Sequence, residues 1–76
     1  MNWQDRIVAN PAVLVGKPII KGTRISVELV IGLLARGYTA EQVLQQYDHL
    51  SFEDIQACLE YARELIESER VFPAPA

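Results

Sequence analysis

The hydrophobic pattern of the chain changes at Ser26, and this change divides the sequence into two kinds of structure. Before Ser26, short runs rich in β-branched residues, RIVAN, AVLV and PIIKG, alternate with glycine and proline. Such runs are typical of short strands joined by turns. After Ser26, apolar residues recur at the three- and four-residue spacing of helices with a buried face. The sequence therefore predicts a short β segment over residues 6–25, followed by helices.

Capping signals place the first two helices. The first helix, predicted over residues 26–37, starts at Ser26, because a serine hydroxyl can accept a hydrogen bond from a free backbone N–H of the first turn. The second helix, predicted over residues 39–47, starts with the capping-box pair Thr39 and Gln42. The connection between the two helices is therefore expected to be very short.

The third helix is predicted over residues 51–69, and its apolar spacing predicts a buried face. The residues expected on that face are Phe52, Ile55, Leu59, Ala62 and Ile66. Prolines cannot continue a helix, so residues 70–76 are expected to form an extended tail. Residues 1–76 are thus predicted to be a single, mostly α domain: an N-terminal short β segment or hairpin followed by a three-helix, helix-turn-helix-like bundle.

Positive charge gathers in the first half of the chain. Residues 1–37 carry five basic and two acidic side chains, a net charge of +3. Three of these cations, Lys17, Lys21 and Arg24, lie in the stretch GKPIIKGTRISV, next to two glycines. Cationic side chains beside glycine can approach a phosphate backbone closely, so these three residues are a candidate nucleic-acid-binding set. The alternative is that the glycines form tight turns and the charges are only solvated.

Negative charge gathers in the second half. Residues 38–76 carry two basic and eight acidic side chains, a net charge of −6. Within the third predicted helix, Glu53, Glu60, Glu64 and Glu67 fall mostly on the side opposite the apolar face. A negative helix can complement the cationic surface of a nuclease that binds RNA, so these four residues are a candidate partner-binding set. The alternative is an ordinary solvated helix face.

Catalytic and metal chemistry have little support in the sequence. With one cysteine and one histidine, a single chain can form neither an intramolecular disulfide nor a zinc site with four Cys or His ligands. Cys58 is interpreted as a core residue and His49 as a turn or surface residue. We therefore expect no enzymatic activity, no metal site and no cofactor.

The length and composition of the chain point to self-association. A domain of 76 residues rarely gains more than about 3–5 kcal/mol from its core, yet 50% of these residues are hydrophobic. Some apolar surface is therefore expected to be buried in a homodimer. No apolar run approaches the ~20 residues of a membrane span, and no leader opens the chain, so we expect a cytoplasmic protein without a membrane partner.

Two stretches resemble a known family, the bacterial and archaeal domain of unknown function 433. They are GKPIIKGTRISVELV, residues 16–30, and LLARGYTAEQVLQQYDHLSFEDIQACLEYA, residues 33–62. The resemblance implies a homeodomain-like three-helix core behind an N-terminal β segment. It also implies an antitoxin role in a type II toxin–antitoxin system, with a PIN-like ribonuclease toxin as the partner. The family supplies no established catalytic residues to carry over.

Three functions stay open on the sequence alone. The first is an antitoxin that neutralises a PIN-like toxin and also binds its promoter DNA through the basic β segment. The second is a stand-alone DNA-binding regulator, and the third is a structural dimerisation module. The helix-turn-helix corner is interpreted as a packing device, because Glu53 and Asp54 at the start of the third helix would face DNA phosphates.

Overall fold

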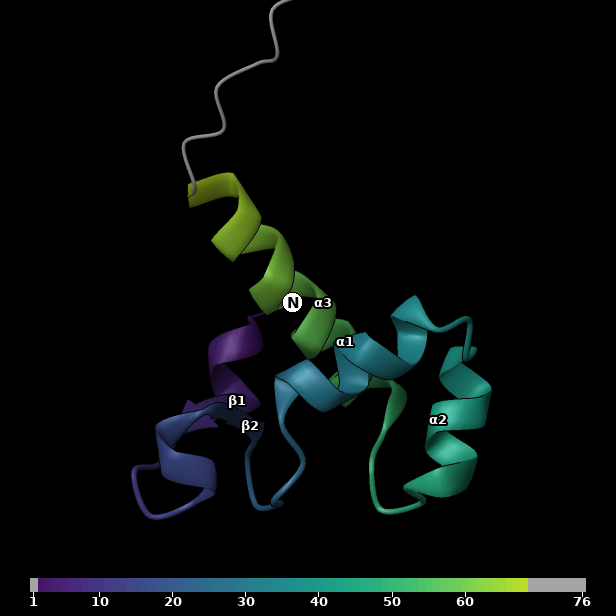
Figure 1. The fold of residues 1–76 in the computed structure, drawn as a ribbon, viewed down its shortest axis with the longest axis horizontal. Coiled ribbons are helices and arrows are strands. Elements are labelled where there is room, and N and C mark those ends of the chain that lie inside the picture. The colour runs from purple at the N-terminus through teal and green to yellow at the C-terminus, as the bar shows by residue number, and fades with distance from the viewer. Residues whose placement is uncertain (1, 69–76) are drawn as a thin grey trace, which may run out of the picture.

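The computed structural model describes residues 2–68 and shows a small hairpin beside three helices (Figure 1). In chain order, the elements are the 3-10 turn η1 (Trp3–Asp5), β1 (Ile7–Ala9), the 3-10 turn η2 (Leu14–Gly16), β2 (Pro18–Ile20), α1 (Val27–Ala35), α2 (Ala40–Gln46) and α3 (Phe52–Ser68). The predicted mostly helical fold, with an N-terminal hairpin, is confirmed. Residues 69–76, including the expected tail, lie outside the described residues.

The hairpin is antiparallel and contributes one apolar face to the core. Ile7 pairs with Ile20, Val8 with Ile19 and Ala9 with Pro18. Ile7 and Ile20 are 4% and 2% exposed, so this pair points into the protein. An isolated two-stranded hairpin is only marginally stable in water, and here α1 and α3 cover it.

The connection between the strands corrects the expectation that AVLV is a strand. Asn10 folds this segment into a turn: its side chain accepts a hydrogen bond from the N–H of Ala12 at 2.9 Å, and its carbonyl accepts one from Val13 at 2.9 Å. Leu14 and Val15 follow with left-handed backbone angles, φ of 50° and 56°, which β-branched residues such as Val15 rarely adopt. Side-chain and backbone hydrogen bonds within the turn therefore outweigh the β propensity of the run.

The helix starts match their predicted caps. The Ser26 hydroxyl accepts a hydrogen bond from the N–H of Leu29 at 2.9 Å. Thr39 and Gln42 form a complete capping box, with hydrogen bonds of 3.1 Å and 2.8 Å in the two directions. These local contacts explain why α1 and α2 begin one residue after the caps at Ser26 and Thr39.

A long-range contact fixes the start of α3 against the hairpin. Asp54 and Ser51 form their own capping box: the Asp54 carboxylate accepts from the Ser51 N–H at 3.0 Å, and the Ser51 hydroxyl accepts from the Asp54 N–H at 3.3 Å. The guanidinium of Arg6 donates to the same carboxylate at 3.0 Å. Asp54 therefore caps α3 and joins it to the residue before β1.

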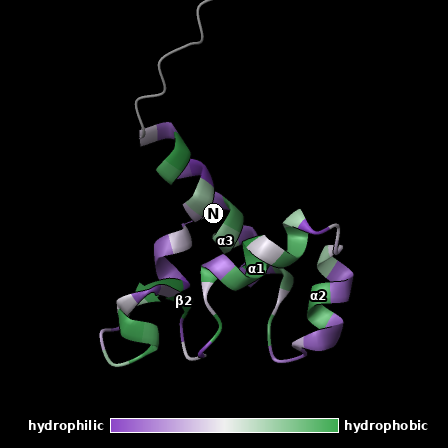
Figure 2. Cartoon of the chain, in the orientation of Figure 1, coloured by the Kyte–Doolittle hydropathy of each residue, from purple (hydrophilic) through white to green (hydrophobic). Residues whose placement is uncertain are grey.

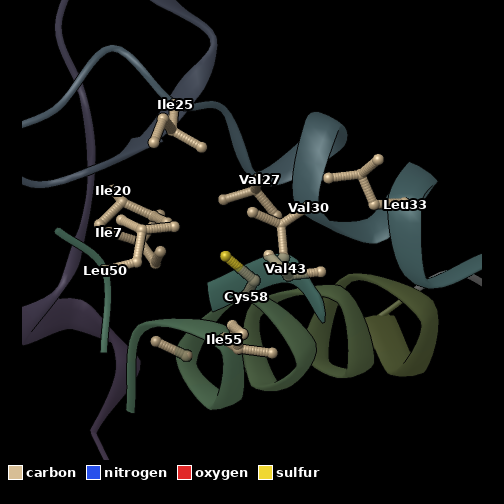
Figure 3. Packing of buried hydrophobic residues seen from close by; sticks show 11 residues of the cluster. Ile7, Ile20, Ile25, Val27, Val30, Leu33, Val43, Leu50, Ile55 and Cys58 are labelled. Atoms are coloured by element: carbon tan, nitrogen blue, oxygen red, sulfur yellow. The ribbon is translucent and has the colours of Figure 1, made fainter. Parts of the chain in front are cut away.

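The core lies where the hairpin, α1, α2 and the first half of α3 meet (Figure 3). Its buried side chains are Ile7, Ile20, Ile25, Val27, Val30, Leu33, Val43, Leu50, Ile55, Ala57 and Cys58. On α3 the buried residues all belong to the first two turns, and the second half of the helix projects beyond the other elements (Figure 1).

The predicted buried face of α3 is largely wrong. Ile55 is 1% exposed as expected, but Phe52, Leu59 and Ile66 are 49%, 48% and 64% exposed. The apolar arc of α3 is wider than the surface that the other elements cover. One cause is η1, because Trp3 packs edge-on against Tyr61 with ring centroids 5.0 Å apart, on a side of α3 that the apolar spacing did not single out. Apolar segments therefore remain visible on the projecting part of α3 (Figure 2).

Candidate functional site

A four-residue loop after β2 holds two of the three candidate cations. Residues 21–24, here called the 21–24 loop, are closed at the base by a hydrogen bond of 2.9 Å from the Ile20 N–H to the Ile25 carbonyl. Both of these isoleucines are buried, at 2% and 8% exposure, so the loop is anchored in the core. Lys21 and Arg24 are exposed on it, and neither has an ion-pair partner within residues 2–68.

Gly22 and Thr23 give the 21–24 loop its shape. Gly22 has φ of 81°, a left-handed conformation that glycine adopts without strain. The Thr23 hydroxyl donates to the Ile20 carbonyl at 2.8 Å and accepts from the Ile25 N–H at 3.0 Å. These contacts hold two cations on a short, internally bonded loop, a geometry in which they can contact neighbouring phosphates.

Lys17 has a different environment from the other two cations. It precedes β2 while Lys21 follows it, so the strand separates them by about 13 Å at ~3.3 Å per residue. The ammonium of Lys17 donates to the carboxylate of Glu28 on α1 at 2.8 Å, and both side chains remain largely exposed. This hydrogen bond lowers the pKa of Glu28 below its usual range. Lys17 is therefore partly neutralised, and the basic site centres on the 21–24 loop.

The four candidate acids lie along one side of α3. Glu53, Glu64 and Glu67 are exposed, and Glu60 is half-buried. The helix as a whole carries five carboxylates, these four and Asp54, against the single cation Arg63. The exposed face thus remains negative, as the sequence predicts.

Arg63, which the sequence reading did not assign to the site, lies among these acids. Its guanidinium pairs with Glu60 at 3.0 Å and also contacts Glu67 one turn further on. The hydrogen bond with Glu60 raises the pKa of Arg63, and the same contact lowers the pKa of Glu60. Glu53 and Glu64 have no ion-pair partner in the described part of the chain, so they are the acids most available to an outside cation.

The remaining reactive side chains do not form a cluster. Cys58 is fully buried, and burial, with a smaller contribution from Asp54, raises the pKa of its thiol to about 12. His49 is exposed in the connection between α2 and α3. No group of three or more His, Cys, Asp or Glu side chains among residues 2–68 is arranged to hold a metal ion. None of the described helices combines the length and apolar character needed to cross a membrane.

Comparison with known proteins links this geometry to one family. A family model described as a protein of unknown function (DUF433) matches residues 7–62. A crystal structure of a DUF433 member protein from Anabaena variabilis is similar to this chain, with a TM-score of 0.78 and 30% sequence identity. The match covers 84% of this chain and 63% of that chain, so this chain spans less than two thirds of its structural relative. No curated protein matches the chain.

Proposed function

This chain belongs to the DUF433 family of proteins of unknown function, and we propose that it acts as a non-enzymatic antitoxin, which binds and neutralises a PIN-like ribonuclease toxin. The observation that carries the proposal is the acidic face of α3, where Glu53 and Glu64 are exposed without an ion pair among the described residues. A ribonuclease that binds RNA presents a cationic surface, and a negative helix complements it.

The rest of the molecule supports binding through α3. The first half of this helix is fixed to the body by the core and by the contact between Arg6 and Asp54, so its exposed face is presented rigidly. A surface that is ordered before binding loses less conformational entropy when the partner arrives. The second half projects from the body, which leaves its acidic face accessible (Figure 1).

Removing the two unpaired acids tests the proposal. The variant Glu53→Gln/Glu64→Gln should associate about tenfold more slowly with a PIN-like toxin at low salt, because charge complementarity raises association rates. Association measured by surface plasmon resonance with the PIN-like product of a neighbouring gene gives the rate. The matched control is Glu41→Gln/Asp48→Asn, which removes two exposed acids outside α3. Equal rates for the two double variants, or separate elution of chain and toxin after co-expression, would contradict the proposal.

The 21–24 loop supports a second function, binding of promoter DNA, either with the toxin or as a stand-alone regulator. Its two cations have no ion pair within the described residues and are held on a rigid turn. The start of α3 is a poorer DNA-reading element, because the carboxylate of Glu53 is exposed there without an ion pair among the described residues and would face DNA phosphates. The observations thus favour the loop over the helix-turn-helix corner.

Salt dependence of DNA binding tests this second function. The variant Lys21→Ala/Arg24→Ala should bind DNA of every sequence about tenfold more weakly. The slope of the logarithm of the association constant against the logarithm of the salt concentration should also become shallower by about two, one for each lost phosphate contact. The Lys17 side chain is paired with Glu28, so Lys17→Ala should change this slope less than the double variant does. Fluorescence anisotropy over a salt series measures both. If the wild-type chain has no affinity for DNA at low salt, this second function is wrong.

A further inference from the structure

Three exposed apolar residues on α3 form a continuous stripe. Phe52, Leu59 and Ile66 follow one another at seven-residue intervals and are 49%, 48% and 64% exposed. Seven residues are close to two turns of a helix with 3.6 residues per turn, so the three side chains lie along one line. A seven-residue apolar repeat is the pattern by which one helix packs along another. We call these three residues the α3 stripe.

We infer that the α3 stripe packs against the α3 stripe of a second copy of this chain, with the two helices antiparallel and a twofold axis at Leu59. The stripe is symmetric about this residue, since Phe52 precedes it by seven positions and Ile66 follows it by seven. A twofold axis at Leu59 therefore places Leu59 against Leu59 of the other copy and each Phe52 against Ile66 of the other copy. Twofold interfaces require this kind of self-complementary surface.

Charges beside the stripe favour the antiparallel arrangement. Arg63 lies at its edge, four positions beyond Leu59, and is paired with Glu60 and Glu67. In the antiparallel pair the two Arg63 residues lie on opposite sides of the axis, about 12 Å apart along the helices at ~1.5 Å per residue. A parallel pair in register would instead bring the two Arg63 side chains together. It would also align the two helix dipoles, which the antiparallel pair opposes.

The proposed dimer leaves the acidic residues accessible. Glu53 and Glu64 lie about a third of a turn from the α3 stripe, given 3.6 residues per turn. A toxin could therefore bind the acidic face while the stripe is covered by the second copy. The dimer does not depend on the antitoxin function, and each can be tested without the other.

The size of the surface sets the expected strength of the dimer. Helix α3 has 17 residues, so it is about 25 Å long and ~10 Å wide. One helix face of this size is smaller than the ~800 Å² per partner of a standard stable interface. We therefore expect a dissociation constant on the order of 10 µM, which makes the dimer visible by dilution.

Sedimentation of charged variants tests the surface. The wild-type chain should be dimeric at about 1 mM and monomeric at about 1 µM, on either side of the expected dissociation constant. Leu59→Lys places two cations at the axis and should remain monomeric at both concentrations. Leu65→Lys is the matched control, because Leu65 is also 48% exposed but lies on another side of α3, beside Trp3 and Tyr61, and this variant should still dimerise. Circular dichroism confirms that each variant is folded.

Two sedimentation results would overturn the inference. A wild-type chain that is monomeric at every concentration would show that the stripe does not pair with a second copy. Equal dimerisation of Leu59→Lys and Leu65→Lys would show that the dimer uses a different surface.

Cysteine cross-linking tests the direction of the helices. Leu59→Cys should form a disulfide-linked dimer under mild oxidation, because the axis brings the two new thiols together. Phe52→Cys alone should not, whereas an equimolar mixture of Phe52→Cys and Ile66→Cys should. The wild-type chain is the background control, since Cys58 is fully buried with a pKa of about 12 and should not cross-link. Self-cross-linking of Phe52→Cys as efficient as that of Leu59→Cys would indicate parallel helices and overturn the antiparallel arrangement.

Discussion

Replacing Ile55 by alanine is expected to lower the free energy of unfolding by about 3 kcal/mol, because it removes a large side chain from a closed part of the core. Ile55 is 1% exposed and belongs to the cluster formed by the hairpin, α1, α2 and α3 (Figure 3). A domain of this size has about 3–5 kcal/mol in total from its core, so the variant should be partly unfolded at room temperature. Urea denaturation followed by circular dichroism measures the change.

Ile66→Ala is the matched control for this prediction. It makes the same change in the same helix, but at a residue that is 64% exposed. At a concentration where the chain is monomeric, its effect should stay within about 0.5 kcal/mol, as for most surface substitutions. If both variants lose the same stability in the monomer, the division of α3 into a buried and an exposed apolar side is wrong.

Asp54→Ala is expected to cost about 2 kcal/mol, although the residue is polar and lies in the first turn of α3. Its carboxylate accepts hydrogen bonds from the Ser51 N–H and the Arg6 guanidinium, both at 3.0 Å, and its side chain is only 14% exposed. Loss of a helix cap costs about 1 kcal/mol, and loss of a partly buried, charged hydrogen bond costs a similar amount or more. Thermal and urea unfolding of the variant measure the sum.

A double-mutant cycle separates the two contributions of Asp54. Arg6→Ala removes the long-range contacts of this guanidinium, to Asp54 at 3.0 Å and to the Ser51 hydroxyl at 3.4 Å, but leaves the Asp54 cap in place. The double variant then gives the coupling energy between the Arg6 and Asp54 side chains. Glu53→Ala is the matched control: it removes the neighbouring acid, which is exposed and has no ion pair within residues 2–68. A cycle with no coupling, or equal losses for Asp54→Ala and Glu53→Ala, would show that Asp54 does not join α3 to the hairpin.

The parts of the fold that could be predicted from sequence depend on local contacts. The caps at Ser26 and Thr39 bond to backbone groups three residues away, so their sequence pattern is sufficient to locate α1 and α2. The hairpin strands were also recognisable from their β-branched residues. The turn at Leu14 and Val15 was not, because β propensity favours a strand there and the hydrogen bonds of Asn10 reverse that preference.

The parts that could not be predicted depend on residues far apart in the chain. Helical spacing shows that α3 has an apolar arc, but not which portion of that arc the rest of the protein covers. Ile55 and Leu59 are equivalent by spacing, yet one is 1% and the other 48% exposed. The difference arises because the covering elements come from elsewhere in the chain, among them η1 at its start, through Trp3 and Tyr61.

The candidate sites show the same division. Lys21 and Arg24 were chosen as candidates from sequence because they stand near Gly22, and local hydrogen bonds hold them on the 21–24 loop. The pairing of Lys17 with Glu28 could not, since it joins the hairpin to α1. The acids of α3 were recognised from spacing, although the neutralising role of Arg63 was missed. The i, i+3 and i, i+4 spacing of Glu60, Arg63 and Glu67 was the signal that could have revealed it.

The contact of the first strand with the last described helix has a consequence for how the protein is made. Ile7 belongs to the same core as Ile55 and Cys58, and Arg6 binds Asp54, 48 positions later in the sequence. A two-stranded hairpin alone is only marginally stable. During translation, the hairpin therefore cannot bury its apolar face until α3 has been synthesised. This core closes only after α3 has left the ribosome, so a transcript cut short before α3 yields a polypeptide without it.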